Sequence, residues 1–288
     1  MSKLTLAVSC PIDTYSGYGA RSRDLVKGFI ALDEYEVKII PQRWGNTRFG
    51  YLDDHNEHDL KSRIINKLEN KPDIWVQVTV PNEFHPVGKF NIGVTAGIET
   101  TVCPQPWIQG LNRMDLILTS SEHSKKVLRD TQWTAKDNNQ VLKLEKPIEV
   151  LFEGIDLKKY FNKPTTNFNL ESVKENFCFL FVGHWLQGEI GHDRKNVGYM
   201  IKSFLHTFKN KPNPPALILK TQSASSSIID RESTLEKINE IRKTVRGTLP
   251  SIYLIHGEIS DEEMNDLYNH PKVKSMVCLT KGEGFGRP

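Results

Sequence analysis

Short apolar stretches that favour β structure alternate with helix-like stretches along the whole of this 288-residue chain. The first expected strand covers residues 4–9, and a glycine turn then leads into an amphipathic helix over residues 20–32. In the second half, residues 177–182 form an uninterrupted apolar run, as expected of a strand buried on both faces. Such alternation is typical of parallel sheets covered by helices. The sequence therefore predicts an α/β fold.

The other expected elements continue this alternation. Further strands are predicted over 35–40, 73–80, 91–96, 114–118, 148–152, 216–220, 252–255 and 273–279. Helices are predicted over 59–69, 195–208, 231–245 and 260–268, and a further helix ends at Arg129. The run Thr119-Ser120-Ser121 is the expected cap of that helix, and Ser260 with Glu263 forms a capping box.

The length of the chain suits two doubly wound domains better than one. The best candidate for a linker is residues 160–175, where Pro164 is followed by a run of Thr and Asn. We therefore expect one Rossmann-like domain over residues 1–165 and a second over 166–288.

Composition narrows the class of protein. Hydrophobic residues make up 38% and charged residues 25% of the chain, as in ordinary soluble globular proteins. A net charge of +3 is small for a dedicated nucleic-acid binder, so no nucleic-acid partner is expected. The cysteines are widely spaced, which favours buried, reduced thiols and a cytoplasmic location, with peripheral membrane contact left open. They are Cys10, Cys103, Cys178 and Cys278.

The turn between the first strand and the first helix is a candidate anion site. It contains Gly17, Gly19 and Arg21, and a glycine turn at a helix N-terminus offers N–H groups to an anion. Only two glycines match the dinucleotide-binding pattern, because position 22 is Ser22. A tight turn with no ligand is an equal alternative.

A second glycine-rich stretch runs from residue 183 to residue 196, after the first strand of the second half. It contains Gly183 and His184 near its start and Arg194 and Lys195 near the expected helix. Two cations at a helix N-terminus can hold a diphosphate without a metal. The alternative is a solvated basic helix start.

The last residues follow the last expected strand with a third glycine-rich turn, Glu283-Gly284-Phe285-Gly286. The glycines let the backbone approach a ligand, and Glu283 supplies an acceptor for hydroxyl groups. A strand that leads into such a turn is how open α/β sheets deliver ligand contacts.

Residues 283–288 resemble the E-G-F-G-x-P opening of the signature of family 4 of the retaining, GT-B-type glycosyltransferases. Residues 183–196 are similar to that family's G-R-…-K-G/N segment, with Lys195 at its lysine and His184 in place of its arginine. Residues 147–156 and 93–100 also look like family segments, the latter with Glu99 followed by Trp107.

The resemblance implies a GT-B fold, with two Rossmann-like domains facing a cleft. It makes 1–165 the acceptor side and 166–288 the donor side. Lys195, with Arg194 or His184, would hold the donor diphosphate. Glu283 would contact the donor sugar with the backbone of Gly284, Phe285 and Gly286. Gly17, Gly19, Arg21 and Glu99 would shape the acceptor side.

The implied activity is transfer of a sugar from a nucleotide-diphosphate sugar to an acceptor hydroxyl, with retention. The acceptor is a glycan, a lipid or a small molecule. No metal or other cofactor is expected, since no D-x-D, H-E-x-x-H or P-loop pattern occurs. The signature's second glutamate falls past Pro288, so we expect a truncated second domain, self-association through its edge and weak activity. The alternatives are a non-catalytic sugar-nucleotide or glycan binding subunit, an epimerase and a phosphorylase.

Overall fold

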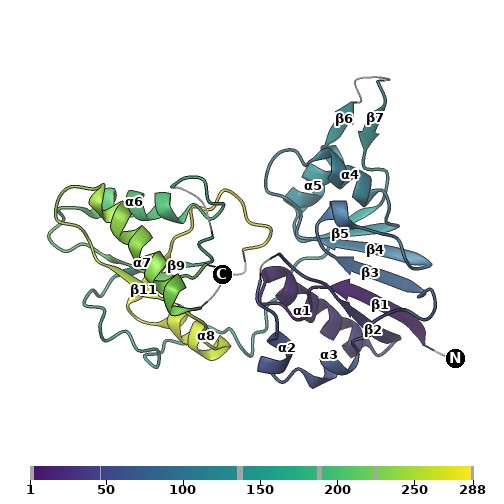
Figure 1. Cartoon of the computed structure of the whole chain (residues 1–288), viewed down its shortest axis with the longest axis horizontal. Helices are drawn as coiled ribbons and strands as arrows, with labels where there is room; N and C mark the ends of the chain where they lie inside the picture. The colour runs from purple at the N-terminus through teal and green to yellow at the C-terminus, as the bar shows by residue number, and fades with distance from the viewer. Residues whose placement is uncertain (1–2, 46, 135–138, 187–189, 224–225, 287–288) are drawn as a thin grey trace. The chain divides into compact units, whose positions relative to one another are not determined.

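A computed structural model of the chain describes residues 3–45, 47–134, 139–186, 190–223 and 226–286 (Figure 1). Its internal contacts divide it into two units. The first comprises Met1–Gly154 with Glu283–Arg287, and the second comprises Ile155–Gly282 with Pro288. The assignment of acceptor and donor domains to 1–165 and 166–288 stays a prediction.

The first unit is built on a six-stranded sheet whose strands all run parallel, in the order β2-β1-β3-β4-β5-β8. The order reverses beside β1, which lies between β2 and β3. The strands are β1 (Leu4–Cys10), β2 (Tyr35–Pro41), β3 (Ile74–Val78), β4 (Phe90–Thr95), β5 (Leu116–Thr119) and β8 (Ile148–Val150).

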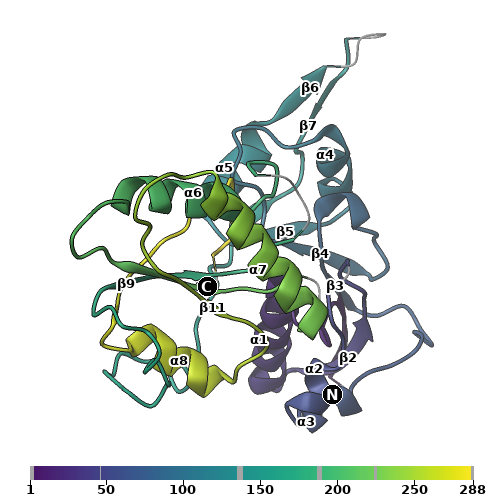
Figure 2. The same ribbon diagram turned by 60° about the vertical axis from the view of Figure 1, so that its left-hand side comes forward.

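Helices connect these strands. They are α1 (Gly17–Leu32), α2 (Tyr51–Asp54), α3 (His58–Ser62), η1 (Pro81–Glu83), α4 (Gln105–Leu111) and α5 (Glu122–Asp130). Ser121, the last residue of the predicted cap, caps α5 by accepting a hydrogen bond from the Ser124 N–H. Two short antiparallel strands, β6 (Gln132–Thr134) and β7 (Val141–Lys143), extend away from the main sheet of this unit in both Figure 1 and Figure 2.

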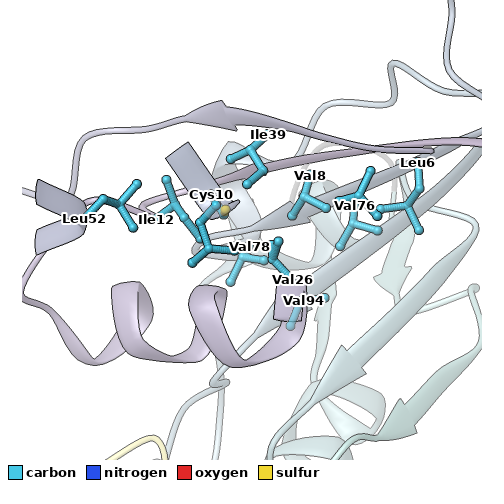
Figure 3. Packing of buried hydrophobic residues seen from close by; sticks show 12 residues of the cluster. Leu6, Val8, Cys10, Ile12, Val26, Ile39, Leu52, Val76, Val78 and Val94 are labelled. Atoms are coloured by element: carbon cyan, nitrogen blue, oxygen red, sulfur yellow. The ribbon is translucent and has the colours of Figure 1, made fainter. Parts of the chain in front are cut away.

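One hydrophobic core cluster of the first unit lies between α1 and the sheet (Figure 3). Val8 and Cys10 of β1, Ile39 of β2 and Val76 of β3 are fully buried there against Val26 of α1. Each such side chain contributes about 1.5–3 kcal/mol when it leaves water. Burial raises the pKa of the Cys10 thiol to about 12, so this cysteine is an uncharged core residue.

The second unit has a four-stranded parallel sheet in the order β11-β10-β9-β12. Its strands are β9 (Cys178–Val182), β10 (Ala216–Lys220), β11 (Ile252–Ile255) and β12 (Val273–Met276). Its helices are α6 (Val197–Phe208), α7 (Ile228–Lys243) and α8 (Asp261–Asn269). Ser260 and Glu263 form the predicted capping box at the start of α8.

Both faces of this second sheet are covered, which explains the continuous apolar run in β9. Phe181 of β9 packs with α6 and α7, whereas Leu180 packs on the opposite face with Leu267 of α8. Figure 2 shows α6 and α7 on one side of the strands and α8 on the other. Successive side chains of a strand point to opposite faces, so a strand between two helical layers is apolar at every position.

The helix predicted over residues 59–69 is wrong beyond Ser62, where α3 ends. The following residues extend alongside β2 instead: the Ile65 N–H donates to Ile39 O, and the Ile39 N–H donates to Arg63 O, both at 2.9 Å. Ile64 pairs with Ile39 in a parallel bridge. Pairing with the sheet edge overrides the helical period of this short segment.

Candidate functional site

The strand order of the second unit marks one point as the expected ligand position. β9 has β10 on one side and β12 on the other, so the chain's direction of winding reverses between β9 and β12. In open α/β sheets, ligands bind outside the carboxyl ends of the strands at such a switch point. Gly183 and His184 directly follow β9, and the segment that leads to Glu283 follows β12.

Gly183 and Lys195 come together at the end of β9. Gly183 has a φ of +155° and donates its N–H to Lys220 O at 3.1 Å. A Cβ atom at Gly183 would lie 3.1 Å from the Phe181 ring and 3.8 Å from Cε of Lys195. The half-buried Lys195 side chain therefore lies beside the backbone at the strand end, and the φ of Gly183 is one that side chains rarely adopt.

His184 lies among positive charges. Desolvation lowers the pKa of the His184 ring, and the charges of Lys195 and Lys220 lower it further, while hydrogen bonds with the backbone of Ser223 and Gln222 oppose the shift. The lowered pKa favours the neutral form of the ring. A cluster of basic side chains at a strand end suits an anionic ligand.

Lys220 is a functional candidate that the sequence analysis missed. It is the last residue of β10, and its Nζ donates to Gly257 O at 2.5 Å. Burial lowers the pKa of Lys220, and the nearby Glu258 carboxylate raises it. Its position in the sequence could have identified it, because Lys220 is the single charged residue of an apolar strand and stands at the end of that strand.

Arg194 binds the segment that follows β12. Its Nη1 donates to Gly282 O at 2.7 Å, and its own carbonyl accepts from the Lys281 N–H at 3.0 Å and from Thr280 Oγ1 at 3.2 Å. The exposed Arg194 thus ties the loop after β9 to the loop after β12. The loops that follow β9 and β12 therefore lie side by side at the switch point of the second unit.

The start of α6 carries a buried carboxylate. Asp193 Oδ2 accepts from the Val197 N–H at 2.9 Å, so Asp193 satisfies the first N–H of the helix although Asn196 stands at the cap position. Asp193 Oδ1 is buried and makes no hydrogen bond within the described part of the chain. Asn196 has a φ of +55°, which explains why α6 begins two residues after the predicted start.

In the first unit, the two predicted glycines of the β1–α1 turn differ. A Cβ atom at Gly19 would lie 2.3 Å from Thr14 O, whereas one at Gly17 would meet nothing within 4 Å. Ser16 Oγ accepts from the Gly19 N–H at 2.9 Å and caps α1. Gly19 is therefore required by close packing, and Gly17 leaves open space at the helix start.

Arg21 lies in the same helix but has a structural environment. It is buried, and its Nη2 donates to Leu151 O at 2.6 Å, with Nε 4.0 Å from the buried Glu153 carboxylate. These contacts tie α1 to the chain that leaves β8. Its predicted acceptor role stays a prediction.

Glu99 and the turn that begins at Glu283 meet in the first unit. The Glu283 N–H donates to the Glu99 carboxylate, and Ser120 Oγ donates to Gly284 O at 3.1 Å. A Cβ atom at Gly284 would lie 2.6 Å from the Ala96 Cβ, so only glycine fits. Phe285 packs edge-on against Phe152, with ring centroids 5.3 Å apart.

Gly286 ends this turn with a φ of +80°, a backbone conformation that favours glycine. Across the described residues, no group of three or more His, Cys, Asp or Glu side chains gathers in the manner of a metal site. No helix in the described part of the chain has the length and apolar character needed to cross a bilayer.

No family model matches the chain, and no curated protein matches its sequence. Solved structures do match. One is the E. coli trehalose-6-phosphate synthase bound with UDP-2-fluoro glucose, with a TM-score of 0.52 and 12% identity over 96% of this chain and 78% of the other. Another is an α-glucosyltransferase in complex with UDP and a 13-mer DNA containing a HMU base, with a TM-score of 0.50 and 12% identity over 96% of this chain and 76% of the other. This chain has the GT-B fold.

In this GT-B chain the predicted site residues fall into two sets. Gly183, His184, Arg194 and Lys195 belong to the second unit. Gly17, Gly19, Arg21, Glu99 and the 283–286 turn belong to the first. At this level of identity the likeness is one of fold, so chemical roles rest on the residues themselves.

Proposed function

We propose that this protein transfers a sugar from a nucleoside diphosphate sugar to an acceptor hydroxyl, with retention of the anomeric configuration. The observation that carries the proposal is the meeting of the loops after β9 and β12 at the switch point of the second unit, where Arg194 Nη1 donates to Gly282 O beside the predicted diphosphate residues. A GT-B fold whose solved relatives were captured with UDP or a UDP-sugar adds support.

The chemistry asks for stabilisation of a leaving diphosphate. Lys195 and Arg194 precede α6, a twelve-residue helix whose N-terminus adds partial positive charge. Fixed positive groups of this kind stabilise charge as it develops on the leaving group, without reorganisation during the reaction. His184 joins them because an arriving diphosphate favours its charged form.

The donor sugar would be oriented by the 283–286 turn. In our proposal the Glu283 carboxylate accepts from sugar hydroxyls, and the backbone of Gly284–Gly286 approaches the sugar closely because no side chain intervenes. Glu99, Gly17 and Gly19 would line the acceptor side. No dedicated nucleophile is assigned, and retention follows from the family resemblance.

The acceptor is a hydroxyl of a glycan, lipid or small molecule. DNA is included as a test, because one solved relative holds a DNA carrying a HMU base. The small net charge of +3 argues against DNA, since phosphate contacts normally require a larger basic surplus.

The deciding experiment measures thermal unfolding of the protein with UDP-, GDP-, ADP- and dTDP-sugars, beside the variant Lys195→Ala. A ligand at about 100 times its Kd stabilises the folded state by about 2.7 kcal/mol, which raises Tm by several degrees. A shift with one base that disappears in Lys195→Ala supports the donor site and identifies the base. Unchanged melting with every donor would contradict it.

Transfer is then separated from the alternatives. Release of the nucleoside diphosphate only in the presence of an acceptor supports a transferase and excludes an epimerase or phosphorylase. Binding without release, whatever the acceptor, supports a binding subunit. The anomeric proton of the product, followed by NMR, tests retention.

A further inference from the structure

Three loops at the carboxyl ends of β9, β10 and β11 are tied together by buried polar side chains. At the centre is Asp230, in the first turn of α7. Its Oδ2 accepts from the Ser223 N–H at 3.0 Å and lies 2.7 Å from His256 Nε2. Its Oδ1 accepts from Ser223 Oγ. The side chains of Asp230 and His256 are only 8% and 6% exposed.

This cluster is not a hydrolytic triad. In such a triad the serine donates to the histidine, which the carboxylate orients from the other side. Here Ser223 and His256 both bind the carboxylate. The Asp230 carboxylate is thus a shared acceptor for Ser223 and His256. The positive end of the α7 dipole stabilises the negative charge of this carboxylate.

The network leads directly to His184. Ser223 and Gln222 lie near His184, and their backbone groups raise the pKa of its ring against the desolvation that lowers it. Gln222 O also accepts from the Trp185 N–H at 2.9 Å, next to His184 in the chain. By fixing Ser223, the Asp230 carboxylate holds the segment to which the backbone next to His184 is hydrogen-bonded.

The β11–α8 loop is held in the same way. His256 directly follows β11 and is bound by Asp230, and Gly257 O accepts from Lys220 Nζ at 2.5 Å. The indole of Trp185, 4% exposed, lies 5.4 Å beneath Lys237 Nζ of α7. Each loop at this edge is thus anchored to a neighbour through buried groups.

We propose that Asp230 is a positioning residue of the donor site, which holds His184 in place for the diphosphate through Ser223 and Gln222. This inference rests on the proposed function, because it assigns His184 to the donor. Asp230 lies outside the motifs found in the sequence, and its proposed effect on the donor passes through Ser223. Its effect depends on hydrogen-bond geometry more than on its charge.

Two variants separate geometry from charge. Asp230→Ala and Asp230→Asn lose the same charge, but the amide of Asn can still accept from Ser223 and occupy the same space. We expect Asp230→Ala to weaken binding of the preferred nucleotide sugar by about tenfold or more, as small misplacements of a binding group do. Asp230→Asn should recover most of this loss.

Controls test folding and the role of His184 apart from donor binding. Ser227→Ala removes the cap that accepts from the Asp230 N–H at 3.1 Å, so it should lower Tm and leave the donor Kd unchanged. The NMR titration of the His184 ring needs no ligand. Its pKa should move towards the ordinary histidine value in Asp230→Ala, where the ring is more solvated, and less in Asp230→Asn. If Asp230→Ala does not fold, Ser223→Ala removes one arm of the network instead.

The outcomes distinguish the two proposals. If the wild-type protein binds no nucleotide sugar, the proposed function fails, and with it the donor role of His184. The positioning role is overturned if the wild-type protein binds a donor but the two variants do not differ from each other. In that case Asp230→Ala and Asp230→Asn would have the same donor Kd and the same His184 titration.

Discussion

The loops that follow the first strand of each unit occupy equivalent places in their sheets but use their cations differently. After β1, only six residues precede α1, and Arg21 and Arg23 turn inward to backbone carbonyls, with 9% and 6% exposure. After β9, the chain travels fourteen residues before α6 begins, and Arg194 stays exposed beside the half-buried Lys195. Basic residues near a glycine turn are thus a structural clamp in one unit and candidate ligand contacts in the other.

Arg21 should show the largest effect on stability. Its guanidinium donates to Leu151 O and Phe152 O and lies beside the buried Glu153. Arg21→Ala leaves a buried carboxylate without this partner, so we expect a loss of about 3 kcal/mol in the free energy of unfolding. Chemical denaturation measures it. Arg194→Ala, at an exposed position, should cost less than about 1 kcal/mol. Equal losses of unfolding free energy in the two variants would contradict the distinction between a structural role for Arg21 and a ligand-binding role for Arg194.

Lys195 should show the reverse pattern, with loss of binding and little loss of stability. Lys195→Ala removes a fixed charge from the donor site, and we expect the donor Kd to rise by about a hundredfold, or about 2.7 kcal/mol. Calorimetric titration with the preferred nucleotide sugar gives the value. Lys211→Ala deletes the same charge at an exposed position outside the site and is the matched control. A similar weakening in both variants would point to a general charge effect.

The sequence predicted the sheets better than the site. Continuous apolar runs such as β9 and β10 were found with nearly correct ends, because burial on both faces leaves a strong signal. Lys195 was found because a motif marks it. Lys220 and Asp230 were missed, since their importance arises from contacts with Gly257 and His256 that lie far away in the sequence.

The predicted helix boundaries were wrong where tertiary contacts determine the end or the start of the helix. Residues 63–65 pair with Ile39 rather than continue α3, and Asn196 in a left-handed conformation delays the start of α6. Neither effect is visible in the period of apolar residues. The burial of Arg21 was likewise invisible, because its partners are backbone carbonyls near residue 151.

The two glycines of the β1–α1 turn provide a smaller test within the first unit. Gly19→Ala places a Cβ atom 2.3 Å from Thr14 O, a backbone atom, so the turn must shift. We expect a loss of about 2 kcal/mol in the free energy of unfolding. Gly17→Ala meets nothing within 4 Å and should change stability by less than about 0.5 kcal/mol. The difference in Tm between these variants checks the packing, and equal Tm values would contradict it.

The smallest expected effect is the pH dependence of donor binding in the second unit. Desolvation, Lys195 and Lys220 depress the pKa of His184, which favours the neutral ring in the ligand-free protein. A bound diphosphate favours the charged ring and raises that pKa, so binding takes up a proton. Affinity should therefore rise as pH falls, by about threefold between roughly pH 8 and pH 6.

A nucleotide sugar is the right probe for this effect, because it lacks the phosphate monoester whose second pKa lies at about 6. Without ligand the sign reverses for stability: the unfolded chain binds the His184 proton more readily than the folded one, so acidification through the ordinary histidine range destabilises the fold. His184→Asn should flatten the binding profile and weaken this acid sensitivity, to which His270, with its own pKa lowered by burial and Lys272, also contributes. A wild-type affinity that stays constant across the range would mean that His184 does not meet the diphosphate, and would leave Lys195 and Arg194 as its only proposed side-chain contacts.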